Sequence, residues 1–164
     1  MKKVSVVTMI LMCVGVSSAL LMSGCIGKKK APETLKVINV LDKRLYDDCH
    51  IKGSINVPFQ DVENKALSWD KSTKIVVYCS NYTCTASGFI AKMLTKMGFE
   101  NVWAYEAGMV GWYKAGLPYE GPAKESYLEL PNIPHENVEK GGVSVITTEE
   151  LHALMKKELH LTEK

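Results

Sequence analysis

The chain has 164 residues, of which 46% are hydrophobic and 23% charged, and this length supports one domain of ordinary size. The composition excludes a disordered or fibrous protein. The net charge of +2, without a long Lys/Arg stripe, argues against a nucleic-acid-binding protein, and five Cys are too few for a disulfide-built miniprotein.

Residues 1–24 are predicted to be a targeting segment outside the fold. Lys2 and Lys3 precede an almost wholly apolar stretch, which ends in the sequence LMSGC at residues 21–25. Small residues before a Cys, after such a stretch, resemble the lipobox of bacterial lipoproteins, although Met22 stands where Leu is commoner. The resemblance implies cleavage before Cys25 and lipidation of its thiol. The alternative is an uncleaved membrane anchor, because the apolar run approaches the roughly 20 residues that span a bilayer.

In either case, the rest of the chain is expected to lie in the cell envelope, facing the periplasm or the cell exterior. Residues 25–35 are expected to be a tether, with the three Lys of residues 28–30 in a solvated linker. The lipid on Cys25 would make the membrane a partner of the protein.

From residue 36 onward, strand and helix patterns alternate. Apolar or β-branched runs predict strands over residues 36–40, 55–58, 74–78 and 101–105. Helical patterns cover residues 43–48, 61–69, 86–97 and 109–115. Asp61 is the expected N-cap of the second helix, and residues 50–54 are expected to form a turn. The alternation predicts an α/β fold, with a parallel sheet and helices on its faces.

The helix over residues 86–97 has the clearest apolar face. Its members are Ala86, Phe89, Ile90, Met93, Leu94 and Met97. Gly98 is expected to end this helix. Trp112 is expected in the core as well.

Cys79 lies at the carboxyl end of the predicted central strand, where ligands bind in open parallel sheets. The loop that follows can turn backbone N–H groups toward the sulfur, and the next helix adds unpaired N–H groups and a partial positive charge. Such a site stabilises a thiolate, so we expect a lowered pKa for Cys79. The chemistry suits attack on a sulfane sulfur or cleavage of a phosphate ester. The alternative is a buried Cys without a chemical role.

Several segments resemble the rhodanese (sulfurtransferase) domain in order and spacing. They are HIKGSINVP at residues 50–58, VVYC at 76–79, MGFENV at 97–102, EAGMVGW at 106–112 and AGLP at 115–118. The match covers about residues 36–120, and it is specific as a set. It implies a three-layer rhodanese-like fold over residues 36–122, with a central parallel sheet flanked by helices. It also implies that Cys79 accepts sulfur as a persulfide from a donor and passes it to a thiol acceptor, without a metal or an organic cofactor.

The active-site loop implied by this resemblance departs from the family in two respects. Its residues are Ser80, Asn81, Tyr82, Thr83, Cys84 and Thr85. Counted back from Gly98, the loop is about two residues longer than usual. Lys and Arg are absent from residues 79–87, so binding of dianionic phosphate is poorly supported and thiosulfate is an uncertain donor.

Cys84 adds a second thiol to this loop. It is a candidate to form a disulfide with Cys79, or to resolve a Cys79 persulfide by exchange. The alternative is a Cys packed under the loop. Cys49 and His50 are expected to be structural. Three positions differ from the family pattern: residues 39–41 lack its Asp-x-Arg, and Cys49 and Ala107 stand where Gly is usual.

The C-terminal part reads as a linker over residues 123–142, followed by a strand–helix extension over residues 143–164. Thr147 and Glu150 form a predicted capping box, and Leu151, Leu154 and Met155 form a helical face. The extension resembles the strand and helix that usually open a rhodanese domain and that are missing before residue 36. We expect residues 143–158 to fill that place as in a circular permutation, to swap into a neighbouring copy, or to belong to a second module.

The sequence therefore predicts a membrane-anchored envelope protein that transfers or carries sulfane sulfur on Cys79, an activity like that of a thiosulfate sulfurtransferase. One alternative is a thiol–disulfide redox protein that uses Cys79 and Cys84. The other is a binding module that keeps the fold without catalysis.

Overall fold

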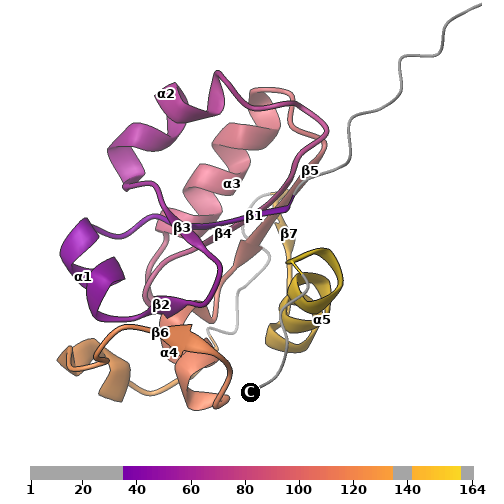
Figure 1. Cartoon of the computed structure of the whole chain (residues 1–164). Coiled ribbons are helices and arrows are strands. Elements are labelled where there is room, and N and C mark those ends of the chain that lie inside the picture. Colours follow the sequence, from indigo (N-terminus) through magenta and orange to yellow (C-terminus); the bar gives the residue numbers. More distant parts are fainter. Residues whose placement is uncertain (1–34, 135–141, 160–164) are drawn as a thin grey trace, which may run out of the picture. The chain divides into compact units, whose positions relative to one another are not determined.

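The computed structural model describes residues 35–134 and 142–159 (Figure 1). The predicted signal peptide, Cys25 and all but the last residue of the predicted tether lie outside the described residues. Within the described part of the chain, no helix has the length and apolar character needed to cross a membrane.

Five parallel strands form the central sheet. They are β1 (Leu35–Asn39), β3 (Ile55–Asn56), β4 (Lys74–Tyr78), β5 (Asn101–Tyr105) and β7 (Ser144–Val145). The order across the sheet is β3-β1-β4-β5-β7. β4 pairs along its whole length with β1 and β5, and its last four residues are buried. The predicted α/β fold with a central parallel sheet is thus confirmed.

Helices lie on both faces of this sheet (Figure 1). α2 (Val62–Ala66) and α3 (Ala86–Lys96) share one core with Ile75 and Val77 of β4. α4 (Gly108–Lys114) and α5 (Thr148–Leu159) share the other core with Val76 and Tyr78. Successive residues of β4 therefore alternate between the two cores, as the two-residue period of a strand requires.

A two-stranded antiparallel ribbon lies apart from the main sheet. It pairs β2 (His50–Ile51) with β6 (Tyr119–Glu120), where the sequence predicted only a turn at residues 50–54. The backbone N–H of Ile51 donates to the hydroxyl of Tyr78 at 3.1 Å, and Ser54 Oγ lies 2.8 Å from the same hydroxyl. These bonds tie the ribbon to the end of β4.

Two shorter helical elements lie beside this ribbon and before α2. α1 (Lys43–Asp48) agrees with the prediction, and Asp42 caps it by accepting from the backbone N–H of Leu45. Asp61 occupies the predicted N-cap position of α2, but its side chain makes no capping bond. It is also the last residue of the short 3-10 helix η1 (Phe59–Asp61), which leads into α2 without a break.

The first part of the predicted linker packs on the domain, which corrects that interpretation. η2 (Ser126–Glu129) places Leu128 in the core at 2% exposure. The carboxylate of Asp48 accepts from the backbone N–H groups of Lys124 and Glu125 and fixes the approach to η2. Ala123 and Tyr127 also pack against this core. Residues 135–141 lie outside the described residues.

β7 and α5 form the other edge of the sheet. β7 runs parallel to β5, with Ser144 opposite Trp103 and Val145 opposite Ala104. The predicted capping box is present: Glu150 N–H donates to Thr147 Oγ1 at 3.2 Å, and Thr147 N–H donates to Glu150 Oε2 at 2.9 Å. The strand–helix unit therefore adds a fifth strand to the sheet of its own chain.

Candidate active site

Cys79 follows β4 directly and is fully buried. The first N–H groups of α4 fix the start of its loop, since Met109 N–H donates to the carbonyl of Cys79 and Val110 N–H to that of Ser80, both at 2.9 Å. The loop then runs to Thr85, and α3 begins at Ala86. The carboxyl end of the central strand thus meets the N-termini of two helices at the candidate site.

Asn81 organises the middle of the loop. Its side-chain Oδ1 accepts from the N–H of Thr83 at 3.1 Å and from the Thr83 hydroxyl at 2.8 Å. Its carbonyl accepts from the N–H of Cys84 at 3.0 Å. The N–H groups of Thr83 and Cys84 therefore bond to Asn81 and not to the sulfur of Cys79. Fewer backbone donors than predicted are left to face that sulfur.

Polar groups of Cys84 and Ser87 surround the sulfur of Cys79. It donates to the carbonyl of Cys84 at 3.4 Å and lies 3.7 Å from Ser87 Oγ, and it also hydrogen-bonds the thiol of Cys84. The bond to the Cys84 thiol and burial raise the pKa of Cys79, and the bonds from the N–H and hydroxyl of Ser87 only partly oppose them. The prediction of a lowered pKa for Cys79 is therefore wrong.

The thiol whose pKa is lowered is that of Cys84. The pKa of Cys84 is lowered to about 6, chiefly by the hydrogen bond from Cys79, and burial opposes this effect. The N–H groups of Ala86 and Ser80 and the Ser80 hydroxyl also contribute to the lowering. Cys84 is also the more accessible of the two. The directions of the two pKa shifts therefore favour a pair with one shared proton, as a thiol at Cys79 and a thiolate at Cys84.

The donors predicted around Cys79 thus surround two sulfurs. The longer loop brings Cys84 back against Cys79. The N–H of Ser87 donates to the sulfur of Cys79, and the N–H groups of Ser80 and Ala86 donate to the sulfur of Cys84. The spacing of the two Cys in a loop without basic residues indicated a pair, but it did not show which sulfur keeps the proton.

Alkylation tests this assignment directly. In the reduced protein, we expect the rate of iodoacetamide modification at Cys84 to rise with pH around a midpoint near 6, because only the thiolate reacts. Cys79→Ser removes the largest cause of the lowered pKa, so the midpoint should move to higher pH. A midpoint at the ordinary thiol value of about 8.5 in the unmodified sequence would contradict the shared proton.

The remaining predicted residues divide between this site and the scaffold. Thr85 accepts from the N–H of Phe89 through its carbonyl at 3.1 Å and so starts α3. Phe89 belongs to the predicted apolar face of α3 but is 62% exposed. It packs on Phe59 at the surface, with ring centroids 5.5 Å apart. Trp112 is buried as predicted.

Cys49 and His50 lie apart from the loop. Cys49 belongs to the core on the opposite face of the sheet from that of Cys79, and burial raises its pKa to about 11. His50 bonds the carbonyl of Tyr46 through Nδ1 at 2.8 Å, and its Nε2 lies 3.3 Å from Glu120. The two residues therefore contribute to packing and to hydrogen bonding within the scaffold.

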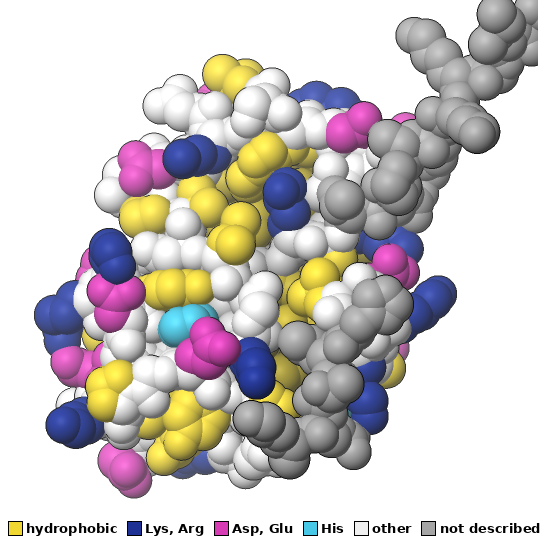
Figure 2. Space-filling view, viewed as in Figure 1, with side chains coloured by type: hydrophobic (Ala, Val, Ile, Leu, Met, Phe, Trp, Pro, Cys, Tyr) yellow, Lys and Arg dark blue, Asp and Glu magenta, His cyan; other side chains and the backbone are white. Residues whose placement is uncertain are grey.

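Charge does not single out another site. On the face shown in Figure 2, basic and acidic side chains are interspersed. Among residues 35–134 and 142–159, no group of three or more His, Cys, Asp or Glu is arranged to hold a metal ion.

A buried central strand that ends in a cysteine loop, at the carboxyl edge of a parallel sheet, defines an α/β protein with a sulfur-based site. A family model described as the rhodanese-like domain matches residues 26–115, more than half of the chain. The chain therefore belongs to the rhodanese-like domain family.

Two curated relatives are 27% identical to this chain. One is named as a sulfur carrier protein, YrkF of Bacillus subtilis, and the match covers 52% of this chain and 45% of that protein. The other is the thiosulfate sulfurtransferase GlpE of Actinobacillus succinogenes, with coverage of 54% and 78%. This chain thus matches less than half of the length of the first relative.

Solved structures give the same fold. The BH2092 protein from Bacillus halodurans is 27% identical, with a TM-score of 0.51 over 56% of this chain and 66% of that chain. The Alr3790 protein from Anabaena is 30% identical, with a TM-score of 0.50 over 56% and 70%. The recognition of a rhodanese-like domain is confirmed.

Proposed function

We propose that the protein transfers or carries sulfane sulfur as a persulfide on Cys79, with Cys84 as the group that takes and returns the proton. The observation that supports this proposal is the place of Cys79 directly after β4, with its sulfur 3.4 Å from the carbonyl of Cys84 and 3.7 Å from Ser87 Oγ. The names of the two curated relatives, a sulfur carrier and a thiosulfate sulfurtransferase, agree with it.

The proposed chemistry balances with a persulfide donor, RS–SH. The proton moves from Cys79 to the Cys84 thiolate, and the new Cys79 thiolate attacks the outer sulfur of the donor. The S–S bond of the donor breaks, RS⁻ leaves, and Cys84 returns a proton to it as RSH. The acceptor thiol gives its proton to the Cys84 thiolate, and the acceptor thiolate attacks the outer sulfur of the Cys79 persulfide. The S–S bond of the persulfide breaks, the acceptor leaves as a persulfide, and the Cys79 thiolate takes the proton from Cys84.

The electrostatics of the loop favour a donor that is neutral or singly charged. Residues 79–87 contain no Lys or Arg, and the loop already holds the negative charge of Cys84. A dianion such as thiosulfate would meet this charge without a basic side chain from the loop to offset it. We therefore assign persulfides, in preference to thiosulfate, as the donor class.

A second candidate function is thiol–disulfide exchange, which the hydrogen bond between the two thiols favours. The Cys84 thiolate would attack a partner disulfide and release one partner thiolate. Cys79 would then attack the mixed disulfide, release the second thiolate and leave a Cys79–Cys84 disulfide.

Mass spectrometry separates the two functions. The full-length reduced chain is incubated with a low-molecular-weight persulfide, freed of excess donor and digested without reductant. The proposal expects one added sulfur atom on the peptide that contains Cys79, and release of that sulfur when a thiol is added. Loss of two hydrogens across Cys79 and Cys84, without any added sulfur, would overturn it in favour of disulfide exchange.

The proposal also places this activity in the cell envelope. Its support is the lipobox-like sequence at residues 21–25, with Cys25 as the lipidated residue, which lies outside the described residues. The exposed side of the membrane would then be where the donor and the acceptor meet the protein.

A further inference from the structure

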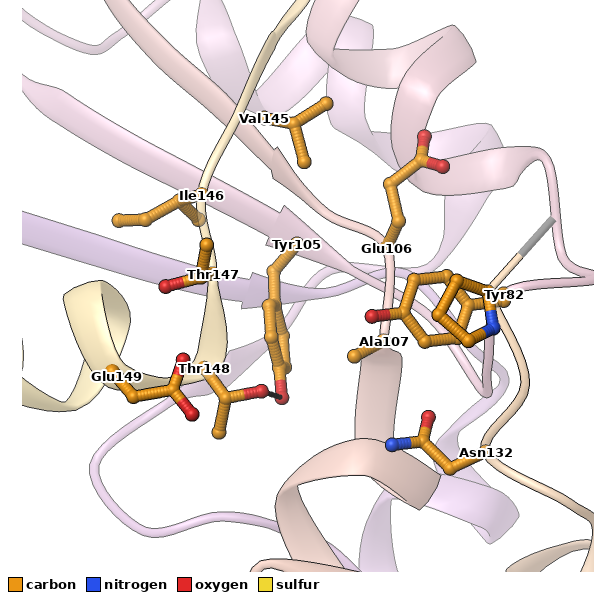
Figure 3. Close-up of a pocket in the computed structure, with 11 residues that line it drawn as sticks. Tyr82, Tyr105, Glu106, Ala107, Asn132, Val145, Ile146, Thr147, Thr148 and Glu149 are labelled. Atoms are coloured by element: carbon orange, nitrogen blue, oxygen red, sulfur yellow. Dashed lines mark hydrogen bonds between the residues drawn. The ribbon is translucent and has the colours of Figure 1, made fainter. Parts of the chain in front are cut away.

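A pocket of about 420 Å³ lies beside the cysteine loop (Figure 3). Its walls come from separate parts of the chain: Tyr82 of the loop, Tyr105 and Glu106 at the end of β5, Asn132 after η2, and Glu149 in the first turn of α5. The volume falls in the range of small-molecule sites. The C-terminal strand–helix unit thus completes a cavity that reaches the cysteine loop at Tyr82.

Two residues that line the pocket, Tyr82 and Glu106, relate it to the cysteine loop and to the start of α3. Tyr82 belongs to the loop between Cys79 and Cys84, and its hydroxyl points into the pocket (Figure 3). Glu106 extends toward α3, where its Oε1 lies 3.3 Å from the place a Cβ would take on Gly88. Gly88 follows Ser87, whose hydroxyl contacts the sulfur of Cys79.

The field in this pocket is negative. No described lining residue is Lys, Arg or His, whereas Glu106 and Glu149 both line it. Burial raises the pKa of Tyr82, and the negative charges of Glu106 and Glu149 raise it further. The two carboxylates therefore act on the same hydroxyl from different elements.

The N-terminus of α5 does not reverse this charge. A helix N-terminus supplies about half a positive charge, whereas Glu149 and Glu150 each bring a full negative charge into the first turn. The capping box also uses the N–H of Glu150, which donates to Thr147. The faces of Tyr82 and Tyr105 add the aromatic surface that attracts organic cations.

Building on the proposed function, we propose that this pocket is the acceptor site and that it selects small thiols that carry an ammonium group. The ammonium group lies beside the rings of Tyr82 and Tyr105, with Glu149 as its counter-charge, and the thiol extends toward the loop. Transfer then follows the balanced step above: the acceptor thiolate takes the outer sulfur of the Cys79 persulfide, and Cys79 is released as a thiolate.

Acceptor specificity tests this inference. The full-length chain is loaded with persulfide, and its discharge is followed at pH 7 with cysteamine, which carries an ammonium group, and with 2-mercaptoethanol, which does not. The measured quantity is kcat/KM for cysteamine divided by kcat/KM for 2-mercaptoethanol. Comparing this ratio between variants removes the difference in intrinsic reactivity between the two thiols. Glu149→Gln should lower the cysteamine preference about two- to fivefold, through KM, as expected for one partly exposed charge pair.

Glu63→Gln is the matched control, because Glu63 is an exposed carboxylate on α2, outside the pocket. It should leave the ratio unchanged. If Glu149→Gln loads sulfur normally and has the same cysteamine to 2-mercaptoethanol ratio as the unmodified chain, the acceptor-site inference is overturned and the proposed function is not. Failure of the chain to load sulfur at all would overturn the proposed function and this use of the pocket with it.

Binding of a probe without a thiol separates the pocket from the chemistry. Choline and its uncharged isostere 3,3-dimethylbutan-1-ol are added to the labelled full-length chain, and NMR shifts of Tyr105 and Thr148, whose side chains meet at 2.8 Å, are recorded. The inference expects choline to shift these signals and the isostere to have a much smaller effect. Equal effects of the two probes would overturn the selection for an ammonium group.

Discussion

Replacement of Cys79 by Ser is expected to reduce persulfide formation by about three orders of magnitude or more, because a serine hydroxyl has neither the nucleophilicity nor the accessible anion of a thiol. The substitution should preserve the fold. The carbonyl of Cys84 and the hydroxyl of Ser87 already surround the position as hydrogen-bond partners. Mass spectrometry after exposure to a persulfide donor measures the effect, and urea unfolding checks the stability.

Cys84→Ser is the matched variant, and it should act differently. The sulfur should still load on Cys79, but about ten- to a hundredfold more slowly at pH 7, because the group that takes the proton is gone. Burial keeps the pKa of Cys79 above its ordinary value, so the loss should shrink as the pH rises. Rapid formation of a persulfide on Cys84 in the Cys79→Ser variant would instead identify Cys84 as the nucleophile.

The two expected results follow from how the loop distributes one negative charge. In the pair, Cys84 lies nearer the solvent and has the lower pKa, and the buried Cys79 has the higher pKa. A negative charge stored at Cys84 costs less than one at Cys79, because three hydrogen-bond donors from Ser80 and Ala86 stabilise it. Transfer of the proton inside the pair then exposes Cys79 as a nucleophile only when a donor sulfur is in contact.

Much of the fold could be predicted because its signals are local. The run of β-branched residues in β4 and the apolar face of α3 each identify their element within one window of sequence. The capping box of Thr147 and Glu150 likewise needs only four residues. The turn residue Gly98, with φ of +89°, ends α3 where the sequence indicated.

The features that could not be predicted depend on residues far apart in the chain. β2 forms only because Tyr119 and Glu120 return beside His50 and Ile51. Leu128 is buried because η2 packs under α4, which no periodicity in its own segment indicates. Phe89 fits the apolar face of α3 by spacing, yet no element covers it.

The candidate site shows the same division. The position of Cys79 after a central strand was predictable, since parallel sheets place ligands at that edge. The proton of the Cys79–Cys84 pair was not, because it depends on which N–H groups the folded loop turns toward each sulfur. The pocket beside the loop could not be predicted either, because Tyr82, Glu106 and Glu149 come from three separate parts of the chain.

Gly108→Ala is expected to destabilise the fold and to disable the site at the same time. Gly108 has φ of +61°, and a Cβ there would lie 2.7 Å from Asn81 N, from the carbonyl oxygen of Cys79 and from the carbonyl carbon of Ser80. These are backbone atoms of the active-site loop, so either the loop or the start of α4 must move. The two hydrogen bonds from α4 to the carbonyls of Cys79 and Ser80 would then weaken together. We expect a loss of about 2–4 kcal/mol in the free energy of unfolding.

Gly116→Ala separates the clash from simple backbone strain. Gly116 has a similar φ of +68°, but a Cβ there would meet no atom within 4 Å. It should therefore cost only about 1–2 kcal/mol, the strain of a left-handed residue, and leave persulfide formation unchanged. Urea unfolding and the rate of loading, measured on both variants at a temperature where each is folded, compare them. Equal losses of stability with normal loading in both would show that contact between Gly108 and the loop does not position Cys79.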